Sequence, residues 1–563
     1  MKNKLLIFVL TIFLSKNIFA DSPEPKRAKK AMVVAADSNA VRAGVEILQK
    51  GGNAVDAAVA VGFALAVTYP QAGNIGGGGF MVIRFVDGKT HSIDYREKAP
   101  TLANRDMYLD ANGKAITEKS RFGHLAAGVP GAVDGLLYAQ EKFGRKKINE
   151  VLSPAIKLAE KGFPLHHSFA EDLENNIEEF KIFPATLKSF SKNGLPYKEG
   201  EILIQKDLAN TLKRISQNGR DGFYKGKTAD LIVEEMQRGG GLITHEDLAN
   251  YKAKERETVR STYRGYEIIS MAPPSSGGTA LIQILNILEG YDLKSFGWNS
   301  AKSVHTIAEA MRRVYADRTE FLGDPDFVKV PTDWLLSKKY SNERRATIQN
   351  DKATPSSEIK NGIAPIYESP QTTHYSVVDK DGNCVSVTTT LNGGFGSYVT
   401  VDGAGFLLNN EMDDFSAKPG VPNMFGLIGG EANAIVPQKR MLSSMTPTII
   451  LKDGKPFLVI GTPGGATIIT TVLQVILNII DYDMNLREAI DAPRIHHQWL
   501  PDQIFYEQRA LSVDTIEKLQ SMGHKLVERK STSGLAEGIM FDYKKNILLG
   551  YSDARGYGAA IGY

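Results

Sequence analysis

The chain has 563 residues, a mass of 61.6 kDa and a formal net charge of +3 at pH 7. Its 42% hydrophobic and 23% charged residues are typical of a globular protein with a large core. The small net charge, without a basic stripe between aromatics, argues against nucleic acid as a partner. The single cysteine, Cys384, excludes an intramolecular disulfide, and we expect it to be buried in a strand.

The first twenty residues have the pattern of an export signal. Lys2 and Lys4 precede an apolar run over residues 5–14, and Ala20 offers a small residue at a cleavage site. The run is too short to span a bilayer comfortably. We therefore expect a signal peptide over residues 1–20 and a periplasmic or secreted protein without a stable membrane anchor. A retained anchor is the alternative.

The first half of the chain predicts buried helices and one strand hairpin. Asn53 is a candidate N-cap for a helix that is apolar on all sides and ends before Pro70. Asp87-Gly88 marks a turn between two strands. The expected elements are helices 38–50 (with Ser38 as N-cap) and 54–68, strands 80–85 and 90–95, and a mostly helical stretch 130–340 with helices at 280–288 and 303–322.

The second half predicts strands again. Residues 352–370 show little periodicity, and we expect them to be exposed and mobile. Asp-Gly turns separate the strand patterns 374–378 from 384–391 and 447–451 from 456–462, and a helix over 467–481 follows. Hairpins and buried helices in both halves predict a layered α/β sandwich of antiparallel sheets without an internal repeat.

Thr372 stands where the aperiodic segment ends and a strand pattern begins. If the bond after Gln371 were cut, Thr372 would carry a hydroxyl and an α-amine on one residue. Such an amine has a pKa of about 7.7–8.0, low enough to act as a base near neutral pH. The alternative is an ordinary threonine pair at a strand start.

Four downstream motifs and one upstream motif decide between these readings. They are Asp94–Pro100 (DYREKAP), Thr388–Gly394 (TTTLNGG), Asn409–Ser416 (NNEMDDFS), Leu442–Pro447 (LSSMTP) and Gly461–Gly465 (GTPGG). Together with Gln371–Asp379 (QTTHYSVVD), they closely resemble the γ-glutamyltransferase (γ-glutamyltranspeptidase) family of N-terminal nucleophile hydrolases. The resemblance runs from about residue 30 to about residue 555.

The resemblance implies a fold, a maturation step and a reaction. The fold is an α/β (α+β) protein, a four-layer αββα sandwich of two stacked, mainly antiparallel sheets. Cleavage between Gln371 and Thr372 gives a large subunit (21–371) and a small catalytic subunit (372–563), which stay together as a heterodimer. The enzyme transfers the γ-glutamyl group of glutathione, or of other γ-glutamyl compounds, to water or to amino acid or dipeptide acceptors. No metal and no organic cofactor is implied.

The same resemblance assigns roles residue by residue. Thr372 is the nucleophile, Thr390 holds its hydroxyl, and Gly464 and Gly465 donate N–H groups to the oxyanion, which suits glycines before a helix. The residues that bind the substrate are Arg96, Ser443 and Ser444 for the α-carboxylate, and Asn392, Glu411 and Asp414 for the α-ammonium.

A loop over residues 418–427 resembles the lid of some bacterial members, with Phe425 as an aromatic gate. Ala466-Thr467 depart from the Ser-Arg that often follows the glycine pair. This departure leaves backbone donors intact but puts acceptor preference in doubt.

Two alternatives remain open. One is a related acylase for glutaryl-type side chains, such as a cephalosporin acylase, which needs no ammonium site. The other is an unprocessed, non-catalytic periplasmic homologue. Metal, nucleotide and serine-hydrolase motifs are missing: His496-His497 have no metal spacing, and no GxGxxG, P-loop or GxSxG occurs.

Overall fold

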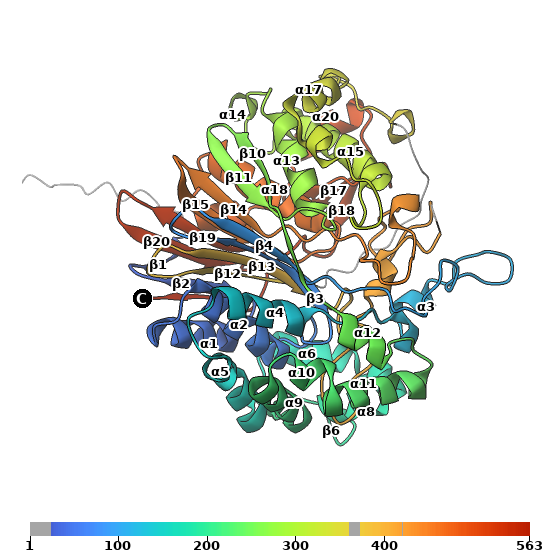
Figure 1. Cartoon of the computed structure of the whole chain (residues 1–563). Helices are drawn as coiled ribbons and strands as arrows, with labels where there is room; N and C mark the ends of the chain where they lie inside the picture. The colour runs from blue at the N-terminus through green and yellow to red at the C-terminus, as the bar shows by residue number, and fades with distance from the viewer. Residues whose placement is uncertain (1–23, 360–371, 419) are drawn as a thin grey trace, which may run out of the picture.

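The computed structural model describes residues 24–359, 372–418 and 420–563. Two sheets lie face to face at its centre, and helices cover the outer face of each sheet (Figure 1). The predicted four-layer αββα sandwich is confirmed. The signal segment 1–20 and Gln371 lie outside the described residues.

Each of the two large sheets has seven strands in the described part of the chain. Every neighbouring pair within them is antiparallel. The first sheet runs β1 (Lys26–Ala28), β20 (Ile547–Ser552), β19 (Glu537–Asp542), β15 (Lys455–Gly461), β14 (Thr448–Lys452), β11 (Tyr266–Ser270), β10 (Val259–Tyr263). The second runs β21 (Ala559–Gly562), β2 (Met32–Ala35), β12 (Thr373–Val378), β13 (Cys384–Thr390), β3 (Gly78–Arg84), β4 (Thr90–Asp94), β9 (Lys254–Arg256).

Strand alternation builds the layers. Along β3, Phe80 and Val82 face the space between the sheets, whereas Met81 and Ile83 face the helices. Successive side chains of a strand point to opposite faces, so a strand buried on both sides is apolar throughout. Cys384 is buried in the layer between the sheets, as expected.

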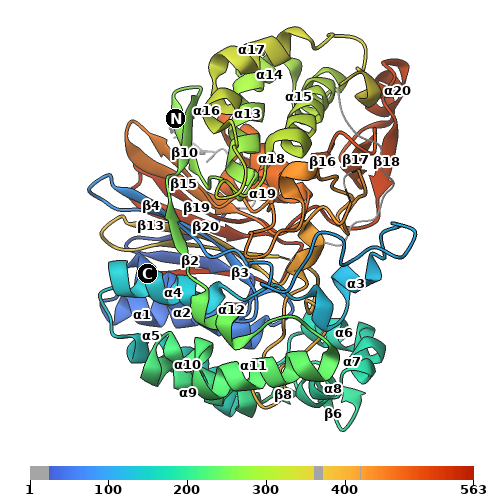
Figure 2. The same cartoon turned by 45° about the vertical axis from the view of Figure 1, so that its right-hand side comes forward.

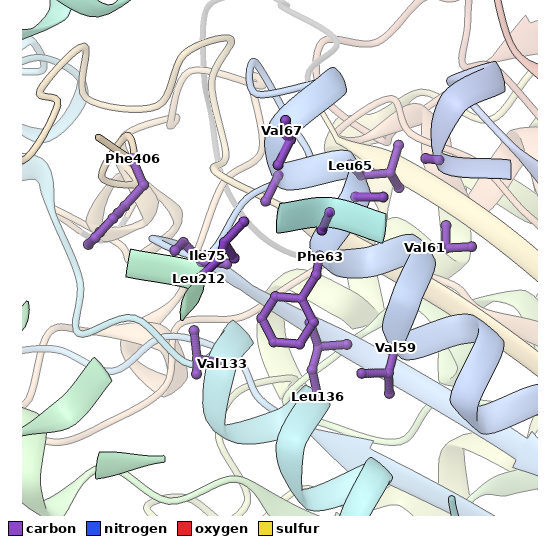
Figure 3. Close-up of a cluster of buried hydrophobic side chains, with 14 of the residues drawn as sticks. Val59, Val61, Phe63, Leu65, Val67, Ile75, Val133, Leu136, Leu212 and Phe406 are labelled. Atoms are coloured by element: carbon purple, nitrogen blue, oxygen red, sulfur yellow. The ribbon is translucent and has the colours of Figure 1, made fainter. Parts of the chain in front are cut away.

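Helix α2 (Ala54–Thr68) shows how the sequence fixes the helical layer under the second sheet. Asn53 Oδ1 accepts from Val55 N and Asp56 N, both at 3.0 Å, and Asp56 Oδ2 accepts from Asn53 N at 2.7 Å. Such a cap contributes about 1 kcal/mol. Every residue of α2 is buried, and Phe63 and Leu136 belong to the same buried hydrophobic cluster (Figure 3).

The helices divide between the two outer layers. Around the second sheet lie α1 (Ser38–Gln49), α2, α4 (Ala132–Phe143) and α5 (Ile148–Lys161), with α9 (Lys206–Asn218), α10 (Asp221–Tyr224) and α11 (Gly226–Gly239) beyond them (Figure 2). Against the first sheet lie α13 (Gly277–Leu288), α18 (Thr467–Ile480) and α19 (Leu486–Asp491), and α15 (Ala301–Phe321) packs on α13 (Figure 1).

The shorter elements complete the described chain. The remaining helices are α3 (Glu118–Arg121), α6 (His167–Asn175), α7 (Ile177–Ile182), α8 (Pro184–Phe190), α12 (His245–Asn250), α14 (Leu293–Phe296), α16 (Thr332–Leu336), α17 (Lys338–Ala346) and α20 (Val513–Ser521). The small strands are β5 (Phe163–Pro164), β6 (Ser191–Lys192), β7 (Leu195–Pro196), β8 (Ile202–Leu203), β16 (Ile495–His496), β17 (Ile504–Glu507) and β18 (Leu526–Arg529). Within the described ranges, no helix is both long enough and apolar enough to cross a bilayer.

Two local expectations are wrong, and a third is incomplete. Asp37, not Ser38, caps α1, because its carboxylate accepts from Asn39 N and Ala40 N. The mostly helical middle of the chain also contains β9, β10 and β11, which extend both sheets. Within the segment expected to be exposed, Ser356 is buried. Its hydroxyl donates to Trp499 O at 2.6 Å and accepts from the Arg312 guanidinium at 2.9 Å.

Candidate active site

Thr372 lies immediately before β12, at the end of the sandwich where the neighbouring strand β13 finishes. Its side chain is buried, and its hydroxyl oxygen is 3.2 Å from that of Thr390, the last residue of β13. The register pairs Thr373 with Thr389, which brings Thr372 opposite Thr390. Thr390 Oγ1 accepts from Asn392 N at 2.8 Å. The structure therefore brings the predicted nucleophile and its hydroxyl partner together.

A buried histidine fixes the strand of Thr372 against the other sheet. Ser376 Oγ donates to Glu537 O at 3.0 Å, so it accepts from His374 Nε2–H at 3.1 Å. The other ring nitrogen then accepts from Thr388 Oγ1 at 2.9 Å. Burial lowers the pKa of His374 to about 3, which keeps the ring neutral.

The same ring spaces β12 from β15. A Cβ on Gly461 would lie 2.3 Å from His374 Cε1, so the imidazole packs directly on the glycine backbone of β15. Gly461 precedes the turn that contains Gly464 and Gly465. The imidazole therefore sets the distance between the predicted nucleophile and the predicted oxyanion donors.

Gly464 and Gly465 adopt backbone conformations that only glycine tolerates well. Their φ angles are +135° and +53°. The turn is held by Thr467, whose N–H and hydroxyl both donate to Gly464 O, at 2.9 and 2.8 Å. Within the described chain, neither Gly464 N–H nor Gly465 N–H has an acceptor. Gly465 and Thr372 line the same pocket.

Arg96 forms the opposite wall of that pocket and is fully buried. It forms ion pairs with Glu411 and Asp414, which were predicted to bind the α-ammonium of a substrate, whereas Arg96 was predicted to bind the α-carboxylate. Its guanidinium also donates to Met441 O at 3.3 Å and to Leu442 O at 3.2 Å. The structure thus places the predicted carboxylate and ammonium ligands in direct contact.

The pocket holds more acid than base. Glu97 lies 3.6 Å from Arg96, and neither of its carboxylate oxygens has a hydrogen-bond partner within the described ranges. Burial raises the pKa of Glu97 to about 7 and that of Asp414 to about 6, although Arg96 opposes both shifts. Burial also raises the pKa of Glu411 well above its ordinary value. A bound ammonium group would supply the missing positive charge.

The serine pair closes the third side of the pocket. Ser443 and Ser444 both line it, and Ser443 Oγ accepts from Met445 N at 3.1 Å. Arg318 on α15 donates to Ser444 Oγ at 3.1 Å and to Ser276 Oγ at 2.9 Å. The sequence reasoning missed Arg318 and Glu97. Glu97 could have been found as the neighbour of Arg96, whereas nothing local marks Arg318.

The predicted lid covers the pocket. Phe425 and Leu427 are buried and line it. Asn423 Nδ2 donates to Asp414 Oδ1 at 2.9 Å, and a Cβ on Gly465 would lie 2.4 Å from the Phe425 ring. Asn392 also lines the pocket and donates to Asn410 O at 3.1 Å. The lid therefore contacts both the acidic wall and the glycine turn.

One cluster in the described part of the chain has the spacing of metal ligands, namely His305, Glu309 and His524. The two rings are hydrogen-bonded at 2.7 Å, and Glu309 pairs with Arg312 and Arg313. A cation would compete with two buried guanidinium groups there. The cluster is a hydrogen-bonded network far along α15 from Arg318, and it does not belong to the pocket.

Comparisons with known proteins agree with this geometry. The family model for gamma-glutamyltranspeptidase matches residues 40–563. The glutathione hydrolase proenzyme of Escherichia coli (strain K12) is 53% identical over 543 residues, which are 96% of this chain and 93% of that protein.

Two solved structures extend the comparison. Cephalosporin acylase from Bacillus halodurans superimposes with a TM-score of 0.85 at 27% identity, over 98% of both chains. The γ-glutamyltranspeptidase of Helicobacter pylori has a TM-score of 0.58 at 47% identity, and its chain, 99% of which is matched, covers 62% of this one.

Proposed function

Because the chain belongs to the γ-glutamyltranspeptidase family, we propose that it is an autoprocessed glutathione hydrolase and γ-glutamyltransferase with Thr372 as its nucleophile. The observation that carries the proposal is one pocket lined by Thr372, Thr390, Gly465, Arg96 and a group of buried acids. A nucleophile, an oxyanion donor and a charge-pairing pocket are what acyl transfer from a glutamyl group needs.

Maturation begins with attack of the Thr372 hydroxyl on the carbonyl of Gln371. The peptide C–N bond breaks as an ester forms on Thr372 Oγ1, and the nitrogen becomes the free α-amine of Thr372. Water then hydrolyses the ester and leaves a carboxylate on Gln371. The products are the large fragment 21–371 and the small fragment 372–563.

The sheet topology explains how the two fragments stay associated. In the second sheet, β12 from the small fragment pairs with β2 from the large one, and β13 pairs with β3. Cutting the chain before β12 breaks none of these ladders. The Helicobacter pylori chain supports this division, because it covers close to the share of the sequence that residues 21–371 make up.

In turnover, the α-amine of Thr372 takes the hydroxyl proton while the oxygen attacks the γ-carbonyl of the substrate. The N–H groups of Gly464 and Gly465 stabilise the oxyanion. The leaving amine, cysteinylglycine in the case of glutathione, takes a proton and departs. Water or the amine of an amino acid or dipeptide then attacks the γ-glutamyl ester, which frees Thr372. No step requires a cofactor.

The acidic wall favours a γ-glutamyl over a glutaryl substrate. Glutaryl groups carry the terminal carboxylate that Arg96 could bind but no ammonium for Glu411 and Asp414. The Bacillus halodurans protein, a cephalosporin acylase, has the same fold. The carboxyls beside Arg96 outnumber the positive charges there, and this observation favours a γ-glutamyl substrate.

Peptide mass spectrometry of the purified protein tests the maturation. We expect two fragments, the smaller one beginning at Thr372, and a single uncleaved chain for Thr372→Ala. Thr372→Ser keeps a hydroxyl and should still cleave, which controls for misfolding. An intact wild-type chain with full activity would refute the mechanism.

Kinetics with matched amides tests the substrate class. We expect γ-glutamyl-p-nitroanilide to be hydrolysed with a kcat/KM at least about a hundredfold above glutaryl-p-nitroanilide, because the glutaryl group leaves the buried acids unpaired. Equal values would favour the acylase. Activity that survives Thr372→Ala in an uncleaved chain would favour a protein that works without this chemistry.

We also propose export through residues 1–20. Among the described residues, no helix is long and apolar enough to cross a membrane. Amino-terminal sequencing of the protein from cell fractions should find a large fragment that begins at Asp21 outside the cytoplasm.

A further inference from the structure

A second cavity lies at the same end of the sandwich as Thr372 but shares no lining residue with the catalytic pocket. It has a volume of about 280 Å³. Its walls come from the start of α6 (His166 to Asp172), from Tyr69 and from the segments around Glu537 and Tyr557. Tyr557 is exposed at its mouth and stacks on His166 with a centroid distance of 5.0 Å.

Among the described residues, no cationic side chain forms an ion pair with the acids of this cavity. Glu537 is 2% exposed, and its Oε2 has no hydrogen-bond partner within the described part of the chain. Asp172 receives only a 3.3 Å hydrogen bond from Gln71 Nε2. Arg555 lines the cavity too, but Glu507 and Asp553 already bind it. Glu537 and Asp172 therefore lack a positive charge that would neutralise them.

Burial changes the charge state of these acids. It raises the pKa of Glu537 well above its ordinary value and that of Asp172 to about 6. Burial thus favours the uncharged form of both carboxyls when nothing pairs with them. An ammonium group in the cavity would favour the ionised forms and release protons.

A hydrogen-bond donor, in contrast to the acidic acceptors, also lines this cavity. His166 Nδ1 accepts from Phe169 N at 3.2 Å as the N-cap of α6, so the proton of the neutral ring is on Nε2. That buried Nε2 has no hydrogen-bond partner within the described ranges. The N–H of Ser168, in the first turn of α6, likewise has no acceptor there. A carboxylate would satisfy both donors.

We propose that this cavity binds a free amino acid or a dipeptide as a zwitterion, with the ammonium at Glu537 and Asp172 and the carboxylate at His166. The pairing of an unpartnered buried acceptor with an unpartnered buried donor is what selects this ligand class. A simple amine would leave His166 unsatisfied, and a simple carboxylate would meet the acids. The inference does not depend on the proposed function, because Thr372 takes no part in it.

The walls of this cavity also support the catalytic pocket. Leu535 lines the cavity, and its N–H donates at 2.9 Å to Thr462 Oγ1, two residues before Gly464. Gln71, which binds Asp172, accepts from Phe395 N at 3.1 Å in the loop that follows Asn392. A ligand in the cavity therefore contacts segments that adjoin both sides of the active site.

Isothermal titration calorimetry with glycylglycine tests the proposal. The matured protein is first inactivated with a diazoketone analogue of glutamine, so that the catalytic pocket is blocked. We expect one binding event at millimolar concentration, with release of up to one proton, measured as a buffer-dependent enthalpy. Acetylglycine, which lacks the ammonium, and methylamine, which lacks the carboxylate, should each bind at least about tenfold more weakly.

Single substitutions test whether glycylglycine binds in this cavity. Glu537→Gln should weaken glycylglycine binding at least about tenfold and reduce proton release, whereas Glu160→Gln, at an exposed position of α5, should change neither. Asp172→Asn tests the site independently if Glu537→Gln does not fold. No binding of glycylglycine, or binding that neither variant weakens, would overturn the proposal. If the diazoketone fails to inactivate the enzyme, the proposed function fails, while the comparison of variants still tests the cavity.

Discussion

Replacing Gly465 by alanine separates the catalytic use of the glycine turn from its structural use. The residue has φ +53°, and a Cβ there would lie 2.4 Å from Phe425 Cδ1 and 2.8 Å from Cε1. No real Cβ makes such contacts, so either the lid or the turn must move. A displaced turn takes the Gly465 N–H away from the position where the oxyanion forms.

The magnitudes of the two effects differ. A left-handed conformation costs a non-glycine residue about 1–2 kcal/mol, which lowers stability without touching the chemistry. Loss of one oxyanion donor lowers kcat about a hundred- to a thousandfold. Gly240 is the matched control, because it has φ +73° as the C-cap of α11 and a Cβ there would meet nothing within 4 Å.

The assay measures kcat for γ-glutamyl-p-nitroanilide per mole of free Thr372 amino terminus, so that slow maturation does not count as slow turnover. We expect Gly465→Ala to lower the unfolding temperature at least as much as Gly240→Ala, because its Cβ also meets Phe425, and only Gly465→Ala to lower kcat. If kcat of Gly465→Ala stays within about threefold of that of Gly240→Ala, this assignment of the oxyanion site is wrong.

Two further predictions concern the neighbours of this turn. Thr390→Val keeps the shape but removes the hydroxyl beside Thr372, so cleavage and kcat should fall about ten- to a hundredfold, whereas Thr390→Ser should retain most of both. The native state holds the Glu97 proton up to about pH 7, against 4.5 for an ordinary glutamate, so the native state binds more protons than the unfolded one across this window. Stability should therefore fall as pH rises from about 4.5 to about 7, and Glu97→Gln should flatten this slope in urea titrations; an unchanged slope would contradict the assignment.

Local patterns predicted most of the secondary structure because capping and alternation act over a few residues. Asn53 and Pro70 bounded α2 as expected, and the two Asp-Gly turns placed β12–β13 and β14–β15 within about two residues. The sequence misplaced the N-cap of α1 because Asp37 and Ser38 are both good caps. It also missed β9 and β11, whose partners include the distant strands β4 and β14, and β10, which pairs with β11 at the edge of the first sheet.

In the candidate site, too, local features were predicted and contacts between distant residues were not. Thr372, Thr390 and the glycine pair were predicted from a strand start, a motif and a helix start, and the structure places Thr372, Thr390 and Gly465 around one pocket, with Gly464 next to it in the turn. The direct contact of Arg96 with Glu411 was not foreseen, because the two residues are 315 positions apart. The burial of Ser356 was missed for the same reason, since its partner Trp499 is 143 positions away.

By itself, the sequence determined the family, the residue that can attack and the layered class of the fold, because each is written in short runs of neighbouring residues. Only the tertiary structure decided that Glu97 and Arg318 adjoin the pocket, that three carboxyls share one guanidinium, and that a second cavity lies nearby. The physical reason is that a charge acquires its chemical character from burial and from its neighbours, and folding brings those neighbours from distant parts of the chain.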